Sequence, residues 1–139
     1  MARLHSIKIE NFRGIEFLSH TFGKENLYCL IGQGDSGKST ILDAIYYVLS
    51  PVWNEAFNDG DFFNCDLTKT IRIEATLLEI PTEFTHDRRF YDYLKSYDPR
   101  THEVSEELDE TIPDGETRDH AITIQLEVTK ELEPEWRVI

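Results

Sequence analysis

Hydrophobic and polar residues alternate along the first part of the chain in the way that half-buried β-strands require. Residues 4–9 and 15–22 each show this alternation, and residues 11–14 interrupt it, so we predict a hairpin or a meander. The next apolar run, residues 27–31, is apolar throughout. Such a run is typical of a strand buried on both faces of a largely parallel sheet.

Apolar residues then recur at helical spacing from Ile41 to Leu49, and Ser50 and Pro51 supply a stop signal. This pattern predicts a helix of about three turns. Residues 53–65 are aromatic and polar without a clear period, and we interpret them as an ordered connection with one helical turn near Asp61.

Two later segments, residues 70–77 and 122–128, alternate like strands with one face in a core, and they could pair antiparallel. Residues 88–96 indicate a short helix. Residues 97–119 are dominated by Glu, Asp, Thr and Pro, which predicts a flexible acidic insertion. The chain ends on residues 136–139, which indicate a strand that is just beginning.

Composition sets limits on these elements. The chain has 139 residues, of which 40% are hydrophobic, so we expect a single folded domain. Its 14 Lys and Arg residues face 27 Asp and Glu residues, and a formal charge of −13 is wrong for a surface devoted to a nucleic-acid backbone. There is no signal-peptide pattern and no apolar stretch near the ~20 residues that span a bilayer. We therefore expect a cytoplasmic protein.

The strongest motif is the segment Gly32-Gln33-Gly34-Asp35-Ser36-Gly37-Lys38-Ser39, which matches GxxxxGK[ST] without a mismatch. Glycines let the backbone approach an anion closely, so that successive N–H groups surround phosphates. Lys38 should reach the β and γ phosphates, Ser39 should bind Mg²⁺, and the N-terminus of the following helix should face the anion. We therefore predict that this loop binds ATP with Mg²⁺.

The alternative is that this segment is only a flexible glycine turn. The predicted context argues against that alternative, because the motif lies between an apolar strand and an amphipathic helix, as a phosphate-binding loop requires. No base-specifying motif is visible, so the sequence does not separate ATP from GTP.

From Arg3 to about Asn64, the chain resembles the N-terminal ATP-binding segment of ABC-type ATPases of the RecF and chromosome-maintenance (SMC) kind. Three features carry the resemblance: the strand and turn Leu4-His5-Ser6-Ile7-Lys8-Ile9-Glu10-Asn11-Phe12-Arg13-Gly14-Ile15, the phosphate loop, and Ser39-Thr40-Ile41-Leu42-Asp43-Ala44-Ile45 after it. Within that group, the chain looks most like the OLD nucleases, in which an ATPase domain precedes a TOPRIM nuclease domain. The segment Asp61-Phe62-Phe63, which leads into the strand predicted at residues 70–77, is similar there.

This resemblance implies that Arg13 lies near the phosphates and that Thr40 contacts the α phosphate. It also implies a possible homodimer through the ATPase heads and control of DNA repair, phage defence or DNA cleavage by the full-length protein. The chain departs from the family by having Gly34 where Asn is frequent, with the acidic Asp35 beside it. The second acidic motif (Walker B) and the signature motif do not occur before Ile139. We therefore assign no catalytic residue and expect residues 1–139 to be the N-terminal part of a longer ATPase that hydrolyses almost no ATP by itself.

The predicted fold is thus an α/β P-loop NTPase, an ABC-ATPase-like N-terminal lobe with an antiparallel β flank. One rival function is a small-molecule or nucleoside kinase in which residues 97–119 act as a lid, although that stretch offers only Arg100 and Arg118 to bind phosphates. Another is an interaction module with a vestigial loop, which the intact Lys38 and Ser39 disfavour.

Overall fold

A computed structural model of the chain describes residues 2–34, 37–52, 54–85, 87–106 and 119–139. Its first two strands, β1 (Arg3–Phe12) and β2 (Ile15–Thr21), form an antiparallel hairpin in which Ile9 lies opposite Leu18. Asn11 and Arg13 have positive φ angles at the turn, a conformation that Asn tolerates better than most residues. The predicted hairpin is confirmed.

The hairpin belongs to a sheet in which every named pairing is antiparallel. Strand β1 pairs with β3 (Ile71–Leu78), which pairs with β6 (Asp119–Val128). The predicted antiparallel pairing of residues 70–77 with residues 122–128 is therefore confirmed. The end of β6 also pairs with β7 (Pro134–Val138), so the strand predicted at the end of the chain forms too.

One long helix, α1 (Lys38–Val48), follows the glycine-rich motif, as predicted. The connection after it contains two short 3-10 turns, η1 (Asp59–Asp61) and η2 (Phe63–Cys65), close to the helical turn expected near Asp61. Two single-turn helices come later, α2 (Thr82–Thr85) and α3 (Arg88–Tyr91), and α3 is shorter than the helix predicted for residues 88–96. Among the helices that the structure describes, none has the length and apolar character needed to cross a bilayer.

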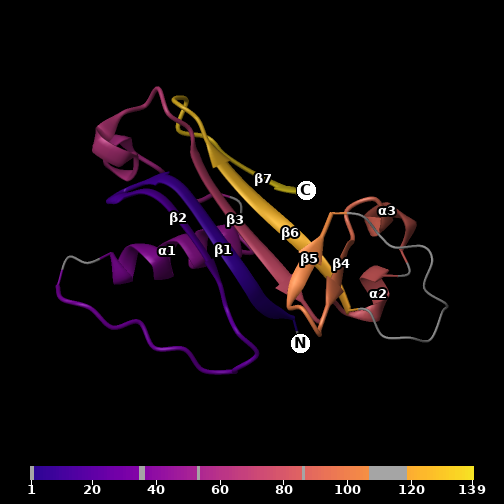
Figure 1. Ribbon diagram of the computed structural model, residues 1–139. Coiled ribbons are helices and arrows are strands. Elements are labelled where there is room, and N and C mark those ends of the chain that lie inside the picture. Colours follow the sequence, from indigo (N-terminus) through magenta and orange to yellow (C-terminus); the bar gives the residue numbers. More distant parts are fainter. Residues whose placement is uncertain (1, 35–36, 53, 86, 107–118) are drawn as a thin grey trace.

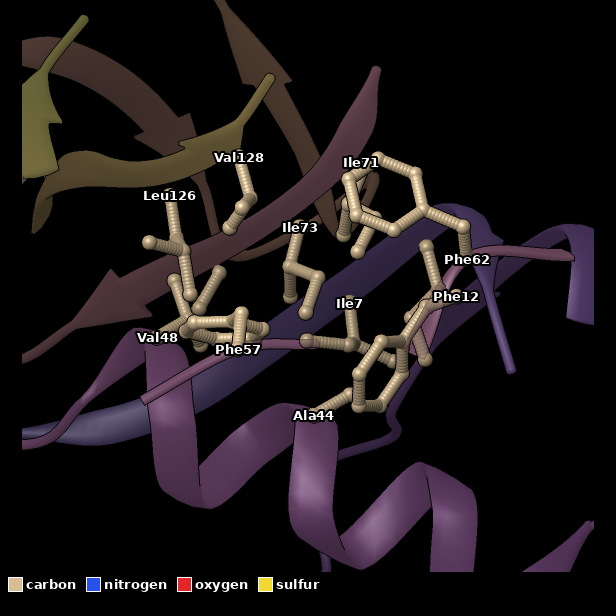
Figure 2. Packing of buried hydrophobic residues seen from close by; sticks show 12 residues of the cluster. Ile7, Phe12, Ala44, Val48, Phe57, Phe62, Ile71, Ile73, Leu126 and Val128 are labelled. Carbon is tan, nitrogen blue, oxygen red and sulfur yellow. The ribbon is translucent and has the colours of Figure 1, made fainter. Parts of the chain in front are cut away.

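Helix α1 lies along one face of the sheet, and the main core fills the space between them (Figure 1). Figure 2 shows Ala44 and Val48 of α1 turned toward Ile7, Ile73 and Leu126 of the strands. Phe12 at the end of β1 completes this cluster together with Phe57 and Phe62 from the connection after α1. Because strand side chains alternate between faces, the opposite face carries polar residues, and there Arg72 forms ion pairs with Glu10 and Glu127.

The prediction of a buried strand at residues 27–31 is wrong for the described fold. The segment contains no strand, and Leu27 is 82% exposed and Ile31 92% exposed. Figure 1 shows the connection from β2 to the phosphate loop running outside the sheet. A parallel strand needs a neighbour for its backbone N–H and C=O groups, and the named strands pair only antiparallel with each other. The apolar run is real, but within the described residues no strand pairs with it.

The flexible insertion predicted at residues 97–119 also needs correction. Its described part forms the end of β4 (Lys95–Asp98), the turn after it and β5 (Glu103–Ser105), and Asp119 already belongs to β6. Strand β4 pairs with both β5 and the start of β6. Tyr97 is buried, which an acidic solvated loop would not allow. Residues 107–118, which contain most of the acidic residues of the predicted insertion, lie outside the described residues.

Candidate nucleotide site

Of the strand and helix expected on either side of the glycine-rich motif, the described fold contains only the helix: the motif ends where α1 begins, but no strand directly precedes it. Gly37 is the N-cap residue of α1 and has a φ of 89°, a left-handed conformation that glycine adopts without steric cost. No side chain of the described residues caps this helix end, and its first turn contains no acidic residue. The free N–H groups and the positive end of the helix dipole are therefore available to an anion.

Lys38 folds back over the loop that precedes it. Its ammonium group donates hydrogen bonds to the carbonyl oxygens of Gly32 and Gln33, and the Nζ–O distance to Gln33 is 2.9 Å. These contacts are exposed to solvent, so they are weak enough to be exchanged for a phosphate oxygen. The backbone of Gly34 is also open, since among the described residues, its chain neighbours aside, no atom lies within 4 Å of a Cβ placed on it.

The two residues after Lys38 were predicted to contact Mg²⁺ and the α phosphate. Ser39 is exposed in the first turn of α1, and its hydroxyl has no hydrogen-bond partner among the described residues. A free hydroxyl at this position fits the hard oxygen ligand that Mg²⁺ prefers. Thr40 is half-buried one residue later. Asp35 and Ser36, which were also predicted to bind the nucleotide, lie outside the described residues.

Arg13 lies between two carboxylates. Its Nη1 donates to Asp43 of α1, and its Nε donates to Oδ1 of Asp61 at 3.0 Å. Its guanidinium also stacks over the ring of Phe12, 4.8 Å from the ring centre. Burial works to lower the pKa of Arg13, but the hydrogen bonds to Asp61 and Asp43 outweigh burial and raise that pKa.

Asp61 anchors this arrangement from η1. It is buried, its Oδ2 accepts a hydrogen bond from the backbone N–H of Asn58, and its carbonyl accepts one from the N–H of Arg13. The turn of the first hairpin is thus tied to α1 and to the connection after it. Sequence reasoning named Arg13 but missed both acidic partners. The only signal for them was their place inside the segments that carry the family resemblance.

Comparison with known proteins agrees with this geometry. Residues 3–132 match the family model of the AAA ATPase domain. A solved structure described as "Structural biochemistry of ATP-driven dimerization and DNA stimulated activation of SMC ATPases" superposes with a TM-score of 0.55. The alignment has 14% sequence identity and covers 97% of this chain and 68% of that one, so it supports the fold alone. A search of curated proteins found no match. Because the family model spans nearly the whole chain, this protein belongs to the AAA ATPase domain family and has a P-loop NTPase-like α/β fold with an antiparallel sheet.

Proposed function

We propose that this chain is the ATP-binding part of a RecF/SMC-like ATPase of the OLD type, which regulates DNA processing or cleavage in the full-length protein. The observation that carries the proposal is the join between loop and helix: a left-handed Gly37, an α1 with no side-chain cap, and Lys38 bonded to the carbonyl oxygens of Gly32 and Gln33 in the loop. Membership of the AAA ATPase domain family supports ATP as the ligand.

The residues present can hold the nucleotide in separate roles. Backbone N–H groups from Gly32 to Thr40 would surround the phosphates, and Lys38 would neutralise part of their charge. Mg²⁺, which supplies charge compensation when bound, would take the hydroxyl of Ser39 as its protein ligand. Arg13 reaches the phosphates only if its contact with Asp43 opens, because both carboxylates hold its guanidinium in the described fold.

The likeness to SMC ATPases also supports a dimer. Those ATPases dimerise in an ATP-driven manner and are activated by DNA. For this chain we propose the same kind of assembly, with two ATP-binding heads meeting in the full-length protein. DNA would then be bound mainly by other parts, since the chain carries a formal charge of −13.

The kinase alternative receives less support from the geometry. A kinase lid would need free arginines near the phosphates. Arg100 instead lies in the turn between β4 and β5, where its backbone N–H donates to Asp98 at 2.8 Å. Arg118 lies outside the described residues. The described part of the expected lid is built into the sheet through the pairing of β4 with β6.

Titration of fluorescent ATP with and without Mg²⁺ tests the proposal. We expect Mg²⁺-dependent binding that Lys38→Ala weakens by at least about a hundredfold, because a charge-assisted contact to phosphate is lost. Lys130→Ala is the matched control, since Lys130 is an exposed lysine of the turn between β6 and β7. Equal affinities of the Lys38 and Lys130 variants would overturn the proposal.

A further inference from the structure

A second recess lies away from the phosphate loop, between the sheet and the β4–β5 hairpin. Its volume is about 450 Å³, which is in the range of pockets for small molecules. Four adjacent strands contribute hydroxyl groups to its wall, from Ser6, Thr21, Thr76 and Thr123. Thr76 and Thr123 bond to each other at 2.9 Å between their hydroxyl oxygens, so these groups are held in place.

Lys95 of β4, a largely buried lysine, supplies a positive charge to this recess. The residue is only 9% exposed, and buried charges require a partner. Among the described residues its ion-pair partner is Glu106, at 3.1 Å, whose side chain is 83% exposed. The ammonium group at the end of this largely buried side chain therefore pairs with a carboxylate that is almost fully in water, and an anion that enters the recess can replace that carboxylate.

Two histidines, His5 and His102, also form part of the wall. His5 lines the recess and is 6% exposed, and its Nδ1 has no hydrogen-bond partner among the described residues. His102, another wall residue, packs edge-on against it with ring centres 4.9 Å apart. His102 itself contacts Tyr97 and the carbonyl of Phe22, so the hairpin that closes the recess is fixed to the end of β2. The hairpin beside the recess is therefore held in place by contacts of its own, and His5 Nδ1 lies behind the surface of the recess.

We propose that this recess binds a small hydroxylated anion of the sugar-phosphate class. The anionic group pairs with Lys95 in place of Glu106, and the hydroxyl groups of the ligand bond to the threonines of the sheet. Glu103 also lines the recess, and its carboxylate accepts hydrogen bonds from ligand hydroxyls. This inference does not depend on the proposed function.

Calorimetric titration with glucose 6-phosphate tests the inference, with glucose as the uncharged probe. All chains carry Lys38→Ala, so that the phosphate loop cannot account for the result. We expect saturable binding of glucose 6-phosphate, no binding of glucose at the same concentrations, and at least about a tenfold loss of affinity in Lys95→Met. Glu106→Gln removes the competing carboxylate and should tighten binding by a few-fold.

Two results would overturn the inference. One is an affinity for glucose 6-phosphate that Lys95→Met leaves unchanged. The other is a failure of Glu106→Gln to bind it at concentrations up to about 10 mM, the weakest range of specific recognition. Because Lys95 is buried, its variant has to be checked by thermal melting. If that variant does not fold, Glu106→Gln decides, since Glu106 is exposed and its replacement leaves the core intact. Unchanged or weaker binding there would then count against the recess.

Discussion

Arg13 shows how one side chain can join three separate parts of the chain. The turn of the first hairpin, α1 and η1 meet at its guanidinium, through Asp43 and Asp61. These partners are 30 and 48 residues away in sequence, so spacing could not have identified them. The resemblance placed Arg13 near phosphates. Because its guanidinium is bonded to Asp43 and Asp61, it could contact a phosphate only by giving up one of these carboxylates. That role stays a prediction.

Asp61→Asn should destabilise the fold. Asp61 is buried and accepts hydrogen bonds from Arg13 and from the backbone of Asn58, and an amide cannot replace both acceptor oxygens. We expect a loss of about 1–3 kcal/mol in the free energy of unfolding, measured by urea denaturation. Asp59→Asn is the control in the same 3-10 turn, because Asp59 is exposed. Equal stability of the two variants would show that the Asp61 contacts contribute nothing.

His5 makes the stability depend on pH. Burial lowers the pKa of His5 below 6.5, with smaller contributions from the charges of His102 and Arg3. The unfolded chain therefore binds this proton more readily than the folded chain, and stability falls as the pH decreases from about 6.5 toward the pKa of the folded state. Melting curves between about pH 7.5 and 5 should show this fall, and His5→Gln should flatten it. An identical pH profile for the variant would rule out His5 as its source.

At the scale of elements, we expect substitutions in the core of the sheet and in the exposed apolar residues 27–31 to have opposite effects on stability: a large loss in the core and almost none in the exposed segment. Ile73 is fully buried between α1 and the strands, so Ile73→Ala should lower the free energy of unfolding by about 2–5 kcal/mol. Ile31 is 92% exposed, and Ile31→Ser should change it by less than about 0.5 kcal/mol. Urea denaturation of both variants checks this contrast. A large loss in Ile31→Ser would mean that residues 27–31 are packed in solution.

Local patterns predicted the elements that pair with a neighbour in sequence and those whose hydrophobic pattern extends over many residues. The hairpin of β1 and β2, helix α1 and the alternating β3 and β6 all follow from their own residues. The β4–β5 hairpin was missed because its strands have only four and three residues, too few to show a period among acidic neighbours. Residues 27–31 were misassigned for a different reason. An apolar run predicts burial, but it does not show which neighbouring strand would pair with it and cover it.

The outer face of α1 is also apolar and exposed, like residues 27–31. Leu42, Tyr46 and Leu49 are exposed at helical spacing, while Ala44 and Val48 are buried against the sheet. A helix that is apolar on both sides is usually covered on both sides. A groove of about 740 Å³ between this helix and residues 27–30 is lined mainly by apolar side chains. In the described fold, the inner face of α1 is therefore covered by the sheet, and its apolar outer face is exposed.

For the whole molecule, binding and hydrolysis should separate. In the proposed function, the loop, Lys38 and Ser39 hold ATP and Mg²⁺, whereas the sequence contains no Walker B or signature motif. Without an acidic group to position the attacking water, positioning and charge stabilisation of the transition state are incomplete. We therefore expect the 139-residue chain to bind ATP yet to release phosphate no faster than Lys38→Ala does.

A phosphate-release assay at saturating ATP, with the fluorescent-ATP titration run on the same sample, measures both properties at once. The control for contamination is the Lys38→Ala chain purified in parallel, because it differs only in losing the Lys38 side chain beyond Cβ. Turnover near the median enzyme value of about 10 s⁻¹, abolished in that variant, would show that the residues present already form a complete catalytic site. Binding without turnover would instead mean that hydrolysis depends on groups that this chain lacks, which is what an ATP-binding part of a larger ATPase requires.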